Sequence, residues 1–201
     1  MIPATRARGG AMRAWDSLVT SPINYRAVLC VDVAGAALFL LVGVRAPMTP
    51  LARIAAIGAG FAAWGLLEYA LHRWLGHGPP SVGRRGHALH HADDTALVAA
   101  PVFAVMAGAW LIWTMLAPLA GVSLAALLVC GLYAGYNHYA LVHHVLHHHH
   151  ALVARVGLGR LERRHRVHHA CHDVNFGVTT TLWDRIFRTY QPEMRSRTIR
   201  S

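Results

Sequence analysis

Four long apolar segments limit the folds that this sequence can adopt. They run from about residue 27 to 44, 54 to 71, 97 to 116 and 119 to 142. A helix of about 20 apolar residues crosses the hydrocarbon core of a bilayer, because it rises about 1.5 Å per residue. Four such segments would overfill the core of one small soluble domain. The sequence therefore predicts an all-α integral membrane bundle of about four transmembrane helices, with a tight turn at Pro118 and Gly121 between the last two.

The arginines predict how this bundle is oriented. All 19 basic residues are arginine, and the formal net charge is +10. With four spans, both termini and the loop after the second span share one side, and only Arg45 and Arg53 lie on the other. The positive-inside rule places the arginine-rich side in the cytoplasm. The basic charge is thus interpreted as membrane topology rather than nucleic-acid binding, and the lysine-free, alanine-rich composition favours a bacterial inner membrane.

Histidine is strongly enriched, and its positions suggest metal ligands. All 16 histidines lie between His72 and His172. They form four clusters on the predicted cytoplasmic side, which we take as candidate metal ligands: His72 and His77; His87, His90 and His91; His143 and His147; and His165, His168 and His169. The third cluster has an alternative register, His144 with His148, which the sequence leaves open.

The spacings within the clusters indicate two metal ions rather than one. His72 and His77 are five residues apart, about 140° on a straight α-helix, so each would serve a different ion. Residues three apart share a helix face, so His87 and His90 would chelate one ion while His91 reaches its neighbour. The fourth cluster repeats this His-x-x-His-His spacing.

Ten imidazoles over two ions give five ligands each. This leaves a coordination position open, unlike a closed structural zinc site. Imidazole suits iron, zinc, copper and nickel, so the ligand type alone does not choose the metal. Because the centre adjoins apolar spans, an apolar substrate is expected.

Two acidic residues lie in or near the spans. Glu68 precedes His72 by one helical turn and is a candidate acceptor that would orient the imidazole; the alternative is a buried acid paired with an arginine. Asp32 is an intramembrane acid and therefore a functional candidate, but the sequence shows no partner for it.

The order and spacing of the four clusters resemble those of the fatty acid hydroxylase superfamily, the histidine-box membrane proteins that include fatty acid 2-hydroxylases and sterol desaturases. Further matches are Glu68–His72, the pair Tyr136 and Tyr139, and the stretch from Asn175 through Asp184 to Phe187. The resemblance covers roughly residues 65–190.

The resemblance implies a four-span helical bundle with a cytosolic histidine-rich cap, two iron ions, molecular oxygen as co-substrate and an electron donor. Zinc is expected to replace iron on expression. Carried over by position, one metal would take His72, His87, His90, His165 and His168. The other would take His77, His91, His143, His147 and His169. His172, Asp173, Asn175 and Asp184, with Glu68, are candidates for contacts to these ligands.

We therefore expect a membrane di-iron oxygenase that hydroxylates or desaturates a lipid. Residues 1–201 would form one domain: a cytosolic arm at 1–26, a transmembrane region at 27–142 with the first two clusters in its 72–96 loop, and a cap at 143–201 with the other two. A cytochrome b5 domain does not fit in the short arm, so a separate cytochrome b5-like or ferredoxin-like protein would supply electrons.

Three other interpretations remain. One is a carotenoid ring hydroxylase, which the stretch after Asn175 disfavours, and another is a non-catalytic metal-handling membrane protein. The third is a zinc-dependent membrane hydrolase, for which ten histidines are too many.

Overall fold

The computed structural model describes residues 4–192, and these residues form helices and loops without a strand. Parts of the predicted arm and cap, residues 1–3 and 193–201, lie outside the described residues. The elements, in chain order, are α1 (Ala4–Val19), α2 (Pro22–Gly43), α3 (Pro50–Ala70), the π-helix η1 (Leu71–Gly76), α4 (Val82–Ala92), α5 (Val102–Ala120), α6 (Val122–His148), α7 (His150–Arg155), α8 (Gly159–Ala170) and α9 (Leu182–Ile186).

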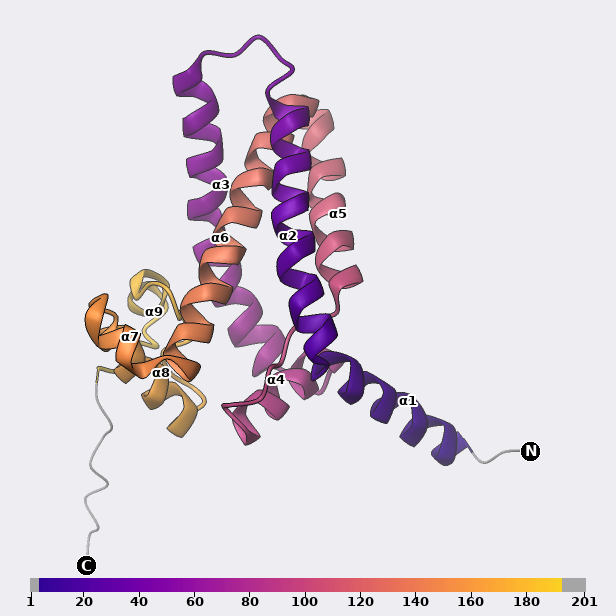
Figure 1. Cartoon of the computed structure of the whole chain (residues 1–201), viewed down its shortest axis with the longest axis vertical. Helices are drawn as coiled ribbons and strands as arrows, with labels where there is room; N and C mark the ends of the chain where they lie inside the picture. Colours follow the sequence, from indigo (N-terminus) through magenta and orange to yellow (C-terminus); the bar gives the residue numbers. More distant parts are fainter. Residues whose placement is uncertain (1–3, 193–201) are drawn as a thin grey trace, which may run out of the picture.

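Four of these helices form an elongated bundle, as predicted. Helices α2, α3, α5 and α6 run side by side, and the α2–α3 loop lies at one end (Figure 1). The shorter helices α4, α7, α8 and α9 gather at the other end. Helix α2, α3 continued by η1, α5 and α6 are each long and apolar enough to cross a membrane. The all-α membrane bundle with a helical cap is therefore confirmed.

Local sequence explains where the spans begin and end. Thr49 caps α3 by accepting a hydrogen bond from the amide of Ala52, and Pro50 follows in the first turn. Ser21 and Pro22 start α2 in the same way. Both are standard helix starts, because the cap satisfies an unpaired amide and proline lacks one. Gly121, with φ of 83°, separates α5 from α6, as predicted. Pro118, which was also expected at this turn, lies inside α5 instead.

The outer surface of the bundle is apolar. Helix α5 has no buried residue, and Phe103, Leu111, Met115 and Leu119 are exposed along it. An apolar surface of this extent is unusual on a soluble monomer and suits contact with lipid chains. The interior is filled mainly from α6, where Ala126, Val129, Cys130 and Tyr133 pack with Phe39 of α2.

Helices α3 and α6 approach each other through glycines. A Cβ atom on Gly60 would lie 2.0 Å from the carbonyl oxygen of Leu128, and one on Gly131 would lie 2.1 Å from that of Ile57. Small residues allow such close packing of membrane helices. This contact fixes α6 against α3, and both helices lead directly into histidine clusters.

Asp32 is buried within the bundle, on α2. Its side chain is 1% exposed, and Oδ1 has no hydrogen-bond partner among residues 4–192. The structure thus gives this intramembrane acid no partner for that oxygen, as the sequence indicated.

Candidate metal centre

The ten predicted histidines lie together at the cap end of the bundle, in two groups of five. Within each group the candidate ligand atoms lie within 4.8 Å of one another. The first group contains His72, His77, His87, His91 and His168. The second contains His90, His143, His147, His165 and His169. Helices α4 and α8 contribute to both groups, so the two sites share their walls.

The π-helix η1 explains why His72 and His77 join the same group. The amide of His77 donates to the carbonyl oxygen of His72 at 3.1 Å, a bond between residues five apart. Such bonds define a π-helix and align positions that diverge on an α-helix. The prediction that these two histidines would serve different ions assumed a straight α-helix and is wrong.

The predicted division of the other ligands is also wrong. His87 groups with His91 instead of His90, and His165 groups with His169 instead of His168. Both observed pairs are four residues apart, a spacing that places side chains one above the other on a helix. The middle histidine of each motif points to the other group. The two His-x-x-His-His motifs do divide their ligands between two groups, but through the i, i+4 pairs.

The structure also selects a register for the third cluster. His143 and His147 enter the second group from the last two turns of α6. His144 instead approaches Tyr25, whose hydroxyl lies 2.9 Å from its Nδ1 atom. The ring of His144 lies near that of His148, with centroids 4.5 Å apart and the rings tilted by 30°.

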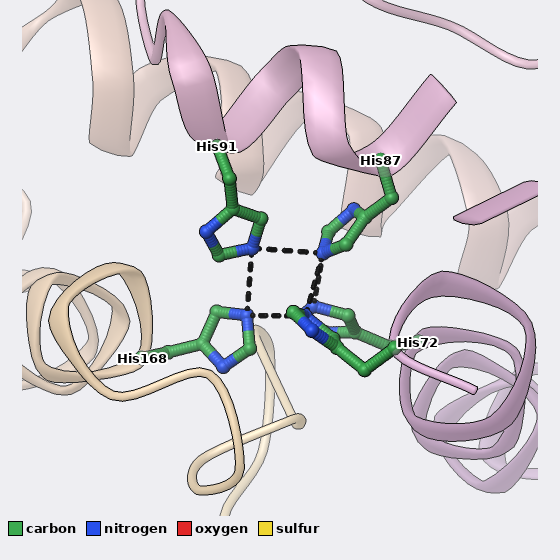
Figure 2. Close-up of side chains that lie close together, drawn as sticks. His72, His87, His91 and His168 are labelled. Atoms are coloured by element: carbon green, nitrogen blue, oxygen red, sulfur yellow. Dashed lines mark hydrogen bonds between the residues drawn. The ribbon is translucent and has the colours of Figure 1, made fainter. Parts of the chain in front are cut away.

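The Nε2 atoms of the first group converge on a common centre (Figure 2). Neighbouring Nε2 atoms are 3.0 Å apart for His72 and His87, 2.8 Å for His77 and His87, and 2.9 Å for His87 and His91. The Nε2 atom of His168 lies 3.1 Å from the Nε2 atoms of both His77 and His91. Ligands about 2.1 Å from one ion and at right angles are about 3 Å apart. The spacing therefore fits five nitrogens around one metal ion.

Different evidence indicates that the second group can also hold a metal ion. The Nε2 atom of His165 lies 2.7 Å from that of His147 and 3.2 Å from that of His169. The Nε2 atom of His90 is buried and has no hydrogen-bond partner among the described residues. A buried nitrogen without a partner is destabilising, and a shared cation would satisfy it.

Backbone carbonyls orient two ligands of the first group. His72 Nδ1 lies 2.5 Å from the carbonyl oxygen of Phe176, and His168 Nδ1 lies 2.7 Å from that of Val174. Each Nδ1–H donates to its carbonyl, which leaves the Nε2 lone pair facing the centre. The sequence carries no signal for this role, since any residue supplies a carbonyl.

Burial keeps these imidazoles neutral. It lowers the pKa of His77 to about 4, and with the neighbouring histidines it lowers the pKa of His90 and His91 to about 2. The pKa values of His87, His165 and His168 also lie well below the usual histidine range, mainly through burial. A neutral imidazole offers the lone pair that a metal requires.

Glu68 supports the site through the segment that carries those carbonyls. Its carboxylate accepts from the amides of Val178 and Thr179, at 2.6 and 3.1 Å, and from the Thr179 hydroxyl at 2.6 Å. The prediction that Glu68 orients His72 directly is wrong, because the Nδ1 atom of His72 donates to the carbonyl oxygen of Phe176. Glu68 instead holds residues 178–179 against α3.

Asp184 and Asn175 hold the same segment from the cap. Asp184 is fully buried and accepts from the amides of Phe176 and Gly177 and from the Thr189 hydroxyl. Asn175 is buried with φ of 54°, and its side chain bonds the backbone of Arg164 and Gln191. Both residues therefore position the carbonyls that orient the histidines, rather than the imidazoles themselves.

The other two predicted supporting residues lie at the edge of the site. His172 is exposed, and its ring centroid lies 4.5 Å from that of His91. Its Nε2 atom is 3.1 Å from the carbonyl oxygen of His169. Asp173 is exposed.

The chain is similar to known proteins in sequence and in fold. The sequence model of a family described as fatty acid hydroxylase matches residues 57–189. The chain is 30% identical over 142 residues to the dihydroceramide fatty acyl 2-hydroxylase FAH2 of Arabidopsis thaliana, a match that covers 66% of this chain and 59% of the relative. It is 32% identical over 150 residues to the fatty acid 2-hydroxylase of Rattus norvegicus, which covers 67% of this chain and 39% of the relative.

A solved structure shares the fold. It is described as full-length scs7p with only the hydroxylase domain visible. The TM-score is 0.64 at 26% identity, over 83% of this chain and 65% of that one. The chain thus spans less than two thirds of the length of these relatives. The matched region contains all ten grouped histidines and the residues that position them, and the chain belongs to the fatty acid hydroxylase family.

Proposed function

We propose that this membrane protein is a di-iron oxygenase that hydroxylates an acyl chain of a lipid. The observation that carries the proposal is the pair of five-histidine groups at the end of an apolar bundle. Two iron ions held by these groups would supply the activation of molecular oxygen. The matched relatives are named for hydroxylation of fatty acyl chains, and the scs7 relative of Schizosaccharomyces pombe is named as a ceramide very long chain fatty acid hydroxylase.

The overall reaction defines what the protein needs from its partners. A C–H bond becomes C–OH, one oxygen atom of O2 enters the product, and two electrons with two protons convert the other into water. We propose a separate electron-transfer protein, cytochrome b5-like or ferredoxin-like, as the source of electrons. By the arginine distribution, this partner would meet the histidine cap on the cytoplasmic side of a bacterial inner membrane.

The chain's own residues would position the metal ligands and give a small co-substrate access to the metal site. The carbonyls of Val174 and Phe176 fix the ligand tautomers, while Glu68 and Asp184 fix those carbonyls. A cavity of about 20 Å³ adjoins the second group, with His90, His143 and His147 in its lining. That volume admits one water-sized molecule, which suits a small co-substrate.

We further propose that residues 1–201 act as one domain, with the arm, transmembrane region and cap as predicted.

The test is metal analysis of the detergent-purified protein expressed with added iron, together with lipid mass spectrometry of the host. Two iron atoms per chain and a lipid with one added oxygen atom support the proposal. Two zinc atoms that cannot be exchanged for iron to give turnover, or a metal-loaded protein without any oxidised lipid, would favour a metal-handling role. A hydroxylated carotenoid as the sole product would overturn the acyl substrate.

A further inference from the structure

A second cavity borders the first half of α8, outside the two histidine groups, and it is strongly basic. Its volume is about 570 Å³, within the range of ligand pockets. None of the ten grouped histidines is among the described residues that line it. Four arginines line it: Arg160, Arg163 and Arg164 from α8, and Arg185 from α9. None of the four forms an ion pair with a described carboxylate, although the buried carboxylates of Asp184 and Glu68 act electrostatically on Arg164.

Two donor atoms of the buried arginine of this set have no partner among the described residues. Arg164 is 6% exposed, and its Nη1 and Nη2 atoms have no hydrogen-bond partner among residues 4–192. Its Nε atom donates to the carbonyl oxygen of Arg160 at 3.4 Å. A buried guanidinium remains charged, and leaving its donors unpaired is destabilising. An anion in the cavity would relieve this, which makes Arg164 the base of a built site.

The rest of the cavity is arranged to bind an oxyanion. The guanidinium of Arg185 is held over the Tyr190 ring, 4.2 Å from its centroid. Threonines at 179–181 form the facing wall. The hydroxyl oxygens of Thr180 and Thr181 accept from Leu182 and Arg185, so each hydroxyl proton remains free to donate. Several guanidinium groups facing hydroxyl donors suit the many oxygens of a phosphate better than the two of a carboxylate.

The cavity lies beside a membrane span. A Cβ atom on Gly65 of α3 would lie 3.4 Å from Trp183 Nε1 and 3.7 Å from the Thr180 methyl carbon. Next to this contact, α9 and the following residue expose Leu182, Ile186 and Phe187. Apolar side chains next to a basic pocket are typical of an element at the lipid–water interface.

We propose that this cavity binds the phosphate group of an anionic membrane lipid, with Arg160, Arg163, Arg164 and Arg185 as its ligands. The lipid headgroup occupies the space between α8 and the threonine wall, and its acyl chains follow α9 onto the surface of α3. This site is separate from the proposed oxygenase chemistry, because lipid binding here requires neither metal nor turnover.

Native mass spectrometry of the full chain in detergent tests this site. The probes are phosphatidylglycerol, and diacylglycerol with the same acyl chains. The variant Arg160→Gln/Arg163→Gln/Arg185→Gln retains the buried Arg164, so the fold is not put at risk. We expect phosphatidylglycerol to bind in preference to diacylglycerol. We expect the triple variant to bind phosphatidylglycerol at least about tenfold more weakly than the unaltered chain does.

A charge-matched variant provides the control. Arg84→Gln/Arg155→Gln/Arg166→Gln removes the same charge from residues that do not line the cavity, and we expect nearly unchanged binding. Equal losses in both variants, or no loss in the first, would overturn the proposal. Glycerol 3-phosphate that binds as tightly as the lipid would also overturn it and identify a soluble phosphate ester. Metal content is measured on the same samples, so this site and the oxygenase proposal can fail independently.

Discussion

His143 and His138 are five residues apart on α6, but their surroundings differ. The His143 ring packs against those of His90, His147 and His165, whereas His138 is exposed beside Phe61. We expect His143→Ala to weaken metal binding in the second group by more than about 100-fold, because it would remove a proposed direct ligand. His138→Ala should leave metal content unchanged. Metal analysis of both purified variants checks this, and equal metal content in the two would exclude His143 as a ligand.

Glu68 is a buried carboxylate whose contacts reach the site through the backbone. We expect Glu68→Gln to lower stability by about 1–3 kcal/mol, because an amide cannot accept from all three donors of Val178 and Thr179. The carbonyl segment at 174–176 should then hold His72 and His168 less firmly and metal affinity should fall. Thermal unfolding and metal titration measure the two effects.

Glu162 offers the matched control for Glu68. It pairs with His150, which is exposed, and with Arg166 at 3.8 Å. Because ion pairs with exposed side chains contribute about 0–1 kcal/mol, Glu162→Gln should change stability little. A larger loss of stability for Glu162→Gln than for Glu68→Gln would contradict the role given to the buried carboxylate.

At the scale of elements, the close contact between α3 and α6 determines where the histidine clusters meet. Gly60→Ala should lower the unfolding temperature, since its Cβ would meet the backbone of Leu128 and such overpacking costs about 1–3 kcal/mol. Gly58 lies on the same helix with nothing within 4 Å of an added Cβ. Gly58→Ala should be neutral or stabilising, because alanine favours helix over glycine. Thermal unfolding in detergent compares them, and equal effects would show that the helices can separate without loss.

At the scale of the whole molecule, the two histidine groups join segments distant in sequence. Candidate ligands come from η1 and the residue that follows it, from α4, from α6 and from α8. A metal that binds only the folded chain stabilises it, by about 2.7 kcal/mol at a concentration 100 times its Kd. We expect removal of metal by a chelator to lower the unfolding temperature, with a smaller shift in His143→Ala. Unfolding temperatures that do not respond to the chelator would argue against metals at this junction.

Orientation is a second property of the whole molecule. The positive-inside rule predicts that the α2–α3 loop faces away from the cytoplasm, while the histidine cap faces it. Alkaline phosphatase inserted in the loop between Gly43 and Pro50 should be active in a bacterial host, and green fluorescent protein fused after the cap should fluoresce. The reverse pattern would invert the proposed topology and place the electron donor on the other side.

The sequence alone determined the number of spans, the all-helical class, the family and the set of ten histidines. These follow from hydropathy, residue type and spacing, which are local properties that the chain carries in every conformation. It also correctly indicated that each His-x-x-His-His motif divides its ligands between two groups, because adjacent side chains diverge on any helix.

Only the tertiary structure decided which histidines share a group. That outcome depends on the π-turn between His72 and His77, on the way α4 and α8 face each other, and on the last turns of α6, which choose His143 over His144. The carbonyls of Val174 and Phe176 were equally invisible in the sequence, and so was the burial of Arg164 with Nη atoms that have no partner among residues 4–192. Backbone groups carry no residue signature, and the solvation of a side chain is fixed by what packs around it.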